Sequence, residues 1–175
     1  MAIYLKQILD GLPETSKAML ARELSIERLC EKCLSRNLIQ ILNENLNNAT
    51  GADENCPKKE GFFGYRHKNS DIKIVNGHEE LLVECKVLTG NNQCDIRNGF
   101  TELLENLVCY GSNQGAVLVL DERPDPKSLF TEALAKKEKK FVELFSKFEG
   151  VEIQLVHVCA PGGVLKVDDY PRHST

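Results

Sequence analysis

The stretch Ser70-Asp-Ile-Lys-Ile-Val-Asn-Gly-His-Glu-Glu-Leu-Leu-Val-Glu-Cys-Lys-Val87 decides the fold that this sequence predicts. Asn76-Gly77 separates two runs rich in aliphatic residues, and Asn-Gly in that position is the strongest short-range signal for a β-hairpin. With these two residues as the loop, Asp71 lies opposite Leu82. We therefore expect an antiparallel hairpin over residues 71–88.

One face of the predicted hairpin carries ionisable side chains. Because side chains along a strand alternate with a period of two, Glu84 and Lys86 share a face with Asp71. Glu84 lies diagonal to Asp71, roughly 7–8 Å away between backbones, so the two carboxylates can converge on one divalent cation. A four-residue loop would place Asp71 directly opposite Glu84, whereas a three-residue loop would place them on opposite faces. The other face is apolar and is expected to pack on a core: Leu81, Val83, Cys85 and Val87.

The alternative for this hairpin is a surface position, with Glu84 and Lys86 solvated. Charged residues are almost never fully buried unless they are paired or bound to a metal. The apolar run Leu81-Leu82-Val83 that precedes them is nevertheless typical of a buried strand. Together with Asp71 on the preceding strand, this favours a metal site over a solvated pair.

The length and charge of the chain limit the possible classes of protein. Its 175 residues favour one domain, and its 42% hydrophobic content is enough for a core. We divide it into an N-terminal helical extension over 1–24, an α/β domain over 25–160 and a C-terminal tail over 161–175. The net charge of −4 argues against a nonspecific nucleic-acid coat protein, which would be basic. Any contact with nucleic acid must therefore come from a local patch.

The sequence also predicts the cellular compartment. No apolar run approaches the roughly 18–20 residues of a membrane span, and the first residues lack the pattern of a signal peptide. We therefore expect a cytoplasmic protein with no membrane partner, whose seven cysteines are reduced thiols. Cys30 and Cys33 form a C-x-x-C without a second pair, and we expect them to pack in the core.

Hydrophobic periodicity predicts the remaining elements. We expect helices over residues 16–48 (in two parts joined near Leu24, with Ser25 capping the second), 95–110 and 128–148. We expect strands over 71–88, 115–121 and 151–159, with a possible further strand over 62–66 and a loop over 47–60. The continuous apolar run over 115–121 is typical of a strand buried on both faces in a parallel pairing. This order predicts an α/β sandwich with a mixed sheet flanked by helices.

These residues resemble the core of the PD-(D/E)xK nuclease superfamily, whose restriction-endonuclease-like fold has an αβββαβ core. The matching features are Asp71 on one strand, Glu84-Cys85-Lys86 on the next, and the helix and apolar strand that follow. The helix Ile96-Arg-Asn-Gly-Phe-Thr-Glu-Leu-Leu-Glu105 is similar to one found in several branches, and the resemblance covers about residues 29–121. Three positions depart from the family pattern, where proline, glutamine and tyrosine are replaced: Ser70, Glu102 and Asn106.

The resemblance implies a divalent-metal-dependent nuclease that hydrolyses phosphodiester bonds. Asp71, Glu84 and Lys86 would be catalytic, and the two carboxylates would hold Mg²⁺ or Mn²⁺ together with the backbone carbonyl of Cys85. Lys86 would orient the attacking water and offset charge at the phosphate. A glutamate on the first helix often completes such a site. Of the three candidates Glu27, Glu31 and Glu44, we prefer Glu31.

The expected substrate is DNA, cut by an endonuclease that works as a homodimer. Candidate contacts to nucleic acid flank the hairpin or precede the next helix: Arg66, His67, Lys68, Lys73, Gln93 and Arg97. The basic run Lys136–Lys140 is expected to be a solvated helix face, and His157 a satisfied histidine of a strand. Two other functions stay open, since a fold does not fix a function. One is a binding or assembly module that has lost turnover, and the other is a domain that senses a small ligand.

Overall fold

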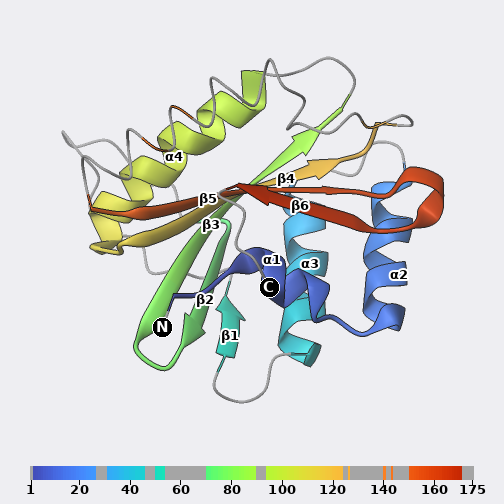
Figure 1. The fold of residues 1–175 in the computed structure, drawn as a ribbon, viewed down its shortest axis with the longest axis horizontal. Coiled ribbons are helices and arrows are strands. Elements are labelled where there is room, and N and C mark those ends of the chain that lie inside the picture. The colour runs from blue at the N-terminus through green and yellow to red at the C-terminus, as the bar shows by residue number, and fades with distance from the viewer. Residues whose placement is uncertain are drawn as a thin grey trace.

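The protein is an α/β structure in which a six-stranded mixed sheet is flanked by helices (Figure 1). The computed structural model describes residues 2–26, 31–45, 50–53, 70–89, 94–123, 126, 140, 143 and 150–170. The elements are, in chain order, α1 (Leu5–Asp10), α2 (Glu14–Leu24), α3 (Glu31–Asn45), β1 (Thr50–Asp53), β2 (Ile72–Asn76), β3 (Glu79–Leu88), α4 (Cys94–Tyr110), β4 (Gln114–Asp121), β5 (Glu152–Cys159), the 3-10 helix η2 (Pro161–Gly163) and β6 (Lys166–Tyr170). The predicted α/β class with a mixed sheet is confirmed.

The strands lie in the sheet in the order in which they occur along the chain. β1, β2 and β3 are antiparallel neighbours, β3, β4 and β5 are parallel neighbours, and β6 is antiparallel to β5. α4 connects β3 to β4 and ends at Gly111, whose φ of 66° lies in the left-handed region, as in a common helix ending. β4 is buried over its whole length, which confirms the strand predicted from the continuous apolar run.

The predicted hairpin is formed by β2 and β3, but its loop begins one residue later than expected. Asn76 pairs with Glu79, so Gly77 and His78 form the loop. Gly77 has a φ of 63°. This left-handed conformation suits glycine and places it at the first loop position instead of the second.

The new loop moves the register of the hairpin by two residues. Ile72 pairs with Val83, so Asp71, the residue before it, lies opposite Glu84. This is the arrangement expected for a four-residue loop. A shift of two residues keeps each side chain on its expected face, and Asp71 and Glu84 therefore share a face as predicted.

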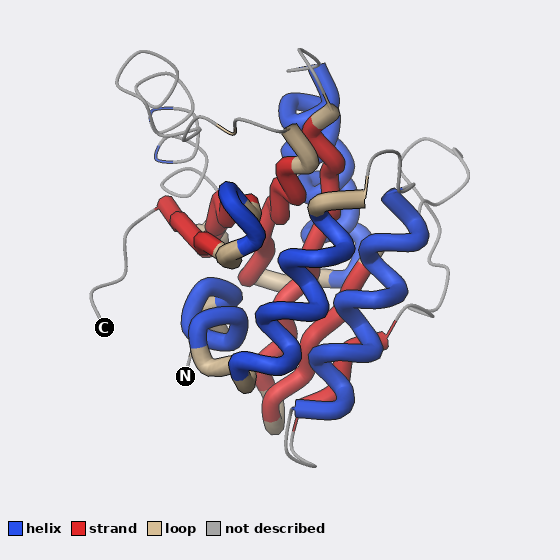
Figure 2. Tube along the Cα trace, turned by 90° about the vertical axis from the view of Figure 1, so that its right-hand side faces the viewer, coloured by secondary structure: helices blue, strands red, loops and turns tan. Residues whose placement is uncertain are grey.

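Two apolar cores cover the two faces of the sheet. The first core lies between the sheet and the helices α1, α2 and α3, of which α2 and α3 lie side by side (Figures 1 and 2). It includes Leu81, Val83 and Cys85 of β3. The second core lies between the sheet and α4, on the opposite face in Figure 1, and includes Leu82. Because side chains alternate along β3, Glu84 and the other even-numbered residues face α4.

The expected N-terminal helical extension corresponds to α1 and α2, which are built into the first core. Leu5 and Leu9 are fully buried there. The backbone N–H of Ile3 donates to Oε1 of Gln114 at 2.9 Å, and that of Leu5 donates to Oε1 of Gln154 at 3.0 Å. These glutamines belong to β4 and β5, so the start of the chain is hydrogen-bonded directly to the central strands.

Two edge strands were not predicted. β1 falls in the expected loop over 47–60, and β6 falls in the expected tail after residue 160. Both lie at the edges of the sheet and contain few β-branched or aromatic residues. Pairing with a neighbouring strand outweighs their weak intrinsic preference.

Ser25 ends α2, close to the joint expected near Leu24. Its backbone N–H donates to the carbonyl of Arg22 at 3.0 Å, and its hydroxyl donates to that of Ala21 at 2.8 Å. A serine hydroxyl that bonds back by four residues satisfies the last turn of its own helix. Residues 27–30, which its expected role as the cap of the next helix would involve, lie outside the described residues.

Some expectations fall partly or wholly outside the described residues. This applies to the possible strand over 62–66 and to most of the helix over 128–148, of which only Lys140 and Glu143 are described, both as helical. Among the described cysteines, Cys85, Cys109 and Cys159 are not disulfide-bonded, whereas Cys33 is disulfide-bonded, contrary to the expectation of reduced thiols. None of the described helices has the length and apolar character needed to cross a membrane.

Candidate functional site

Asp71, Glu84 and Lys86 lie on one face of the sheet, on the side covered by α4. Glu84 is 3% exposed and Lys86 is 7% exposed, whereas Asp71 is half-buried at the point where β2 begins. The alternative of a surface hairpin with a solvated Glu84 and Lys86 is therefore wrong. Two buried ionisable groups on one strand need partners, and the structure supplies these from β2 and α4.

The carboxyl group of Glu84 is held next to that of Asp71. Burial, followed by the charge of Asp71, raises the pKa of Glu84 to about 9, although Lys86 acts to lower it. The two carboxyl groups are within hydrogen-bonding reach of each other. Glu84 is therefore protonated at neutral pH and donates this hydrogen bond to Asp71, as expected for like charges forced together.

Asp71 is fixed by the main chain of the strand opposite. Its Oδ2 accepts a hydrogen bond from the backbone N–H of Cys85 at 2.8 Å. The N–H and C=O of one strand residue point to the same side of the strand. The carbonyl of Cys85 is therefore directed to the edge of β3 where the Asp71 carboxylate lies.

Lys86 is held by α4 at both its stem and its head. Its Nζ forms an ion pair with Oε2 of Glu102 at 2.8 Å. A Cβ atom on Gly99 would lie only 2.8 Å from Cγ of Lys86, and 3.2 Å from its Cε. Because glycine has no side chain, Gly99 leaves the space between β3 and α4 that the stem of Lys86 occupies.

Asn106 completes the set of contacts from α4. Its Nδ2 donates to Oε1 of Glu84 at 2.5 Å, and both residues are buried. Asn106 and Glu102 are four residues apart, so they lie on the same side of the helix. In the sequence both stand out only as departures from the family pattern. Their spacing, on the helix that follows the Glu84-x-Lys86 motif, is the signal that would have found them.

The described ionisable groups of the site carry an excess of negative charge. With Asp71, Glu84 and Glu102 ionised, three negative charges face one positive charge on Lys86, a net of −2. Such an excess is unfavourable in a buried cluster unless it is neutralised. The proton on Glu84 removes one of the two excess negative charges at neutral pH, and a divalent cation would balance both of them.

The site offers carboxylate oxygens, which are ligands that Mg²⁺ prefers. Among the described residues, no three His, Cys, Asp or Glu side chains are grouped in a way that could hold a metal ion. Mg²⁺ is typically bound by only one or two carboxylates, with water and substrate phosphates as its other ligands. Asp71 and Glu84, with the carbonyl of Cys85, match that donor set.

The predicted helix glutamate is not placed by the structure. α3 begins at Glu31, but the side chain of this residue is outside the described part of the chain, as is the whole of Glu27. Glu44 is exposed and accepts a hydrogen bond from Gln40 at 2.9 Å. α3 packs on the face of the sheet opposite to Glu84, and a third acidic ligand from this helix stays a prediction.

The predicted contacts to nucleic acid are placed only in part. Lys73 shares the face of Asp71 but forms an ion pair with Glu80 at 2.5 Å. Arg97 is exposed in the first turns of α4, at the end of the helix near Lys86. The other candidates lie outside the described residues: Arg66, His67, Lys68 and Gln93.

Comparisons of this chain with protein-family models, curated proteins and solved structures gave no match. The resemblance to the PD-(D/E)xK superfamily therefore rests on Asp71, Glu84, Lys86 and the elements around them.

Proposed function

We propose that this protein is a divalent-metal-dependent nuclease of PD-(D/E)xK type that acts as an endonuclease on DNA. The observation that carries the proposal is the pair of carboxyl groups of Asp71 and Glu84. They face each other on adjacent strands, and Lys86 follows two residues further along the same face. The order α3, β1, β2, β3, α4, β4 supports it, because this is the αβββαβ order of the restriction-endonuclease-like core.

Asp71 and Glu84 would hold Mg²⁺ or Mn²⁺, with the backbone carbonyl of Cys85 as a further ligand. When bound, the cation lowers the pKa of its water and offsets charge that develops on the phosphate. The contribution of Asp71 is its fixed position, since its other partner is the backbone N–H of Cys85. The contribution of Glu84 is a carboxyl group that gives up its proton when the cation takes its place.

Lys86 would hold the attacking water and a phosphate oxygen. An ammonium group has three donors, and Glu102 takes one of them. The ion pair with Glu102 and the passage of the stem over Gly99 fix the position of the ammonium group. Such fixed placement of a charged donor is how electrostatic stabilisation of a transition state is achieved.

A binding or assembly module without turnover is the second candidate. The ion pair between Lys86 and Glu102 favours it, because it ties the catalytic ammonium to a carboxylate beneath α4. In the nuclease, the substrate phosphate must compete with Glu102 for Lys86. In the module, the pair is simply part of the second core.

A cleavage assay with Mg²⁺ or Mn²⁺ separates the two candidates. The wild-type protein is compared with D71A, E84A and K86A on plasmid, linear and single-stranded DNA, with E105A as the control because Glu105 is an exposed acid on α4. We expect each of the first three substitutions to lower cleavage at least about a hundredfold, equivalent to roughly 2.7 kcal/mol of transition-state stabilisation, and E105A to leave it unchanged. Equal cleavage by all variants would reject the site. Metal-dependent DNA binding without cleavage by the wild type would favour the module.

A further inference from the structure

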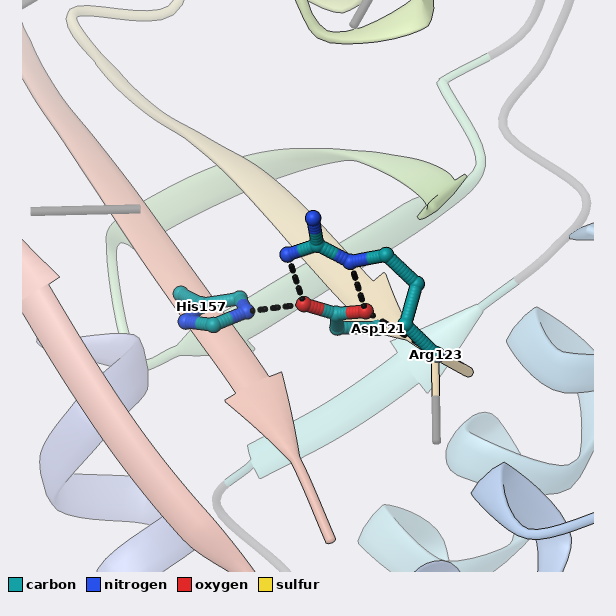
Figure 3. A network of polar contacts seen from close by, with 3 residues as sticks. All are labelled: Asp121, Arg123 and His157. Carbon is teal, nitrogen blue, oxygen red and sulfur yellow. Dashed lines mark hydrogen bonds and ion pairs between the residues drawn. The ribbon is translucent and has the colours of Figure 1, made fainter. Parts of the chain in front are cut away.

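A second polar cluster lies at the carboxyl end of β4, outside the proposed metal site. Asp121, the last residue of β4, is 2% exposed and accepts hydrogen bonds from two other residues (Figure 3). Arg123 donates from Nε to Oδ1 at 2.8 Å and from Nη2 to Oδ2 at 2.7 Å. His157, on β5, contacts Oδ2 through Nε2 at 2.9 Å. The guanidinium of Arg123 and the ring of His157 therefore share one buried carboxylate.

The carboxyl group of Asp121 is ionised. Burial acts to raise the pKa of Asp121, but hydrogen bonds from Arg123 and His157 outweigh it and lower the pKa to about 2. An ionised carboxylate only accepts, so the proton on Nε2 of His157 must point to it. Nδ1 of His157 is buried and has no partner among the described residues. His157 therefore contacts the Asp121 carboxylate from one side, and Arg123 contacts it from the other.

The cluster faces the same side of the sheet as the proposed metal site. Lys86 pairs with Val119 across β3 and β4, and Asp121 follows Val119 by two residues on the same face. His157 pairs with Val119 from β5. The cluster therefore lies beyond Lys86, towards the carboxyl ends of the parallel strands, and open α/β sheets bind their ligands at that end.

The arrangement of Arg123 suits an anionic ligand. A guanidinium has five N–H donors in a rigid fork, and Asp121 takes two of them in a parallel pair. The side chain is 22% exposed, so the fixed cation reaches the surface from a buried anchor. Asp121 lies four residues beyond Val117, the partner of Glu84 on β4. This separation is roughly 13 Å along the strand, which is close to the rise of about four nucleotides along one strand of a duplex.

We infer that Arg123, oriented by Asp121 and His157, binds a backbone phosphate of the nucleic acid a few nucleotides away from the phosphate held at Asp71 and Glu84. The inference rests on the proposed nuclease function and names the part of the site that holds the substrate strand. Asp121 and His157 are positioning residues, and Arg123 is the residue that touches the substrate. The contact is to a phosphate, so it carries no sequence preference of its own.

The test measures binding of labelled DNA oligonucleotides to the full chain by fluorescence anisotropy at several salt concentrations. All proteins carry E84Q, so that cleavage does not interfere, and the variants compared are R123A, R123K and D121N. R22A is the matched control, because Arg22 is an exposed arginine on α2, on the other face of the sheet. Thermal melting of each variant verifies that it is folded.

We expect R123A to weaken binding about tenfold more than R22A and to lower the slope of log K against log salt by about one unit. R123K retains the charge without the fork and should fall between wild type and R123A. D121N should also weaken binding, because Arg123 is still present but loses the carboxylate that orients it. Equal binding and equal salt slopes for R123A and R22A would overturn this inference alone, provided that the wild-type protein cleaves DNA. No cleavage and no binding by the wild-type protein would overturn the inference together with the proposed function.

Discussion

At the scale of single residues, the proposed site depends on a carboxyl group that is neutral at pH 7. Glu84 is buried against Asp71 and accepts a hydrogen bond from Asn106, and its pKa is raised to about 9. The folded protein therefore binds the Glu84 proton more tightly than the unfolded chain, in which the carboxyl group titrates near pH 4.5. Folding stability from this group is complete below about pH 4.5 and is lost as the pH rises towards 9.

Glu84→Gln tests this sign directly. The amide is neutral at every pH and can keep the contacts to Asp71 and Asn106. We expect the stability of the wild type relative to E84Q to fall between pH 5 and pH 8, by at most about 1.4 kcal/mol per pH unit. Urea unfolding at these two pH values measures the difference, with E105Q on the exposed side of α4 as the control. A difference between wild type and E84Q that does not change with pH would contradict the raised pKa.

Some of these residues could be predicted from the sequence and others could not. The shared face of Asp71, Glu84 and Lys86 follows from the period of two along a strand. The spacing of Glu102 and Asn106 places them on one side of α4. The rotation of α4 that turns this side towards Glu84 and Lys86 depends on packing against the sheet, which no local pattern specifies. The Asp121 cluster joins residues 36 positions apart in sequence, and His157 in an apolar strand gave no sign of its carboxylate partner.

At the scale of elements, the position of Lys86 depends on the close approach of α4 to β3. Gly99 makes this approach possible, because any side chain there would overlap the lysine stem and come within 3.2 Å of Val117. The helix thus has a glycine in its interior, where alanine would ordinarily be more favourable by about 1 kcal/mol. The stability cost of a glycine at this position is explained if the side chain of Lys86 must lie beneath α4.

Gly99→Ala should therefore displace Lys86 and separate it from Glu102. We expect DNA cleavage to fall at least about tenfold, and stability to fall by about 1–3 kcal/mol through overpacking. Gly115→Ala is the matched control, since its Cβ would meet the flexible end of Leu103 and not the lysine. It should cost stability while leaving cleavage by the folded protein intact. Full cleavage by folded G99A would show that the position of Lys86 does not matter for activity.

The elements themselves were predicted unevenly. α4, β4 and β5 have strong periodic or apolar patterns and lie at the centre of the sheet, and their bounds agree with the predicted ranges to within a residue or so. β1 and β6 are edge strands with short polar sequences, and only pairing with a neighbour makes them strands. The hairpin was found from Asn76-Gly77, but its register depended on which loop position takes the left-handed glycine.

At the scale of the whole molecule, the first core joins the start of the chain to the sheet that carries the site. Leu9 of α1 is completely buried in the same core as Leu81 and Val83 of β3. The odd-numbered residues of β3 pack against this core, and the even-numbered residues, which include Glu84 and Lys86, face α4. The order of β2, β3, α4, β4 and β5 could be predicted from the sequence. The packing of α1 against the sheet could not, since it joins residues far apart in the chain.

Leu9→Ala tests this connection. We expect it to lower the free energy of unfolding by about 2–5 kcal/mol, because the cavity would lie in the shared core. Met19→Ala on α2 is the control, since this side chain is 54% exposed and should change stability by less than about 0.5 kcal/mol. If L9A were as stable as M19A, residues 1–24 would be an appendage and not part of the fold.

The central claim is that Asp71 and Glu84 form one metal site, and titration calorimetry with Mn²⁺ tests it most directly. At pH 7.5 the wild-type protein should bind the ion and release about one proton for each ion bound, because Glu84 must lose its proton to become a ligand. Repeating the titration in buffers with different ionisation enthalpies counts this proton. E84Q and D71N should bind far more weakly and release none. No binding by the wild type, or binding that E84Q leaves unchanged, would contradict the account.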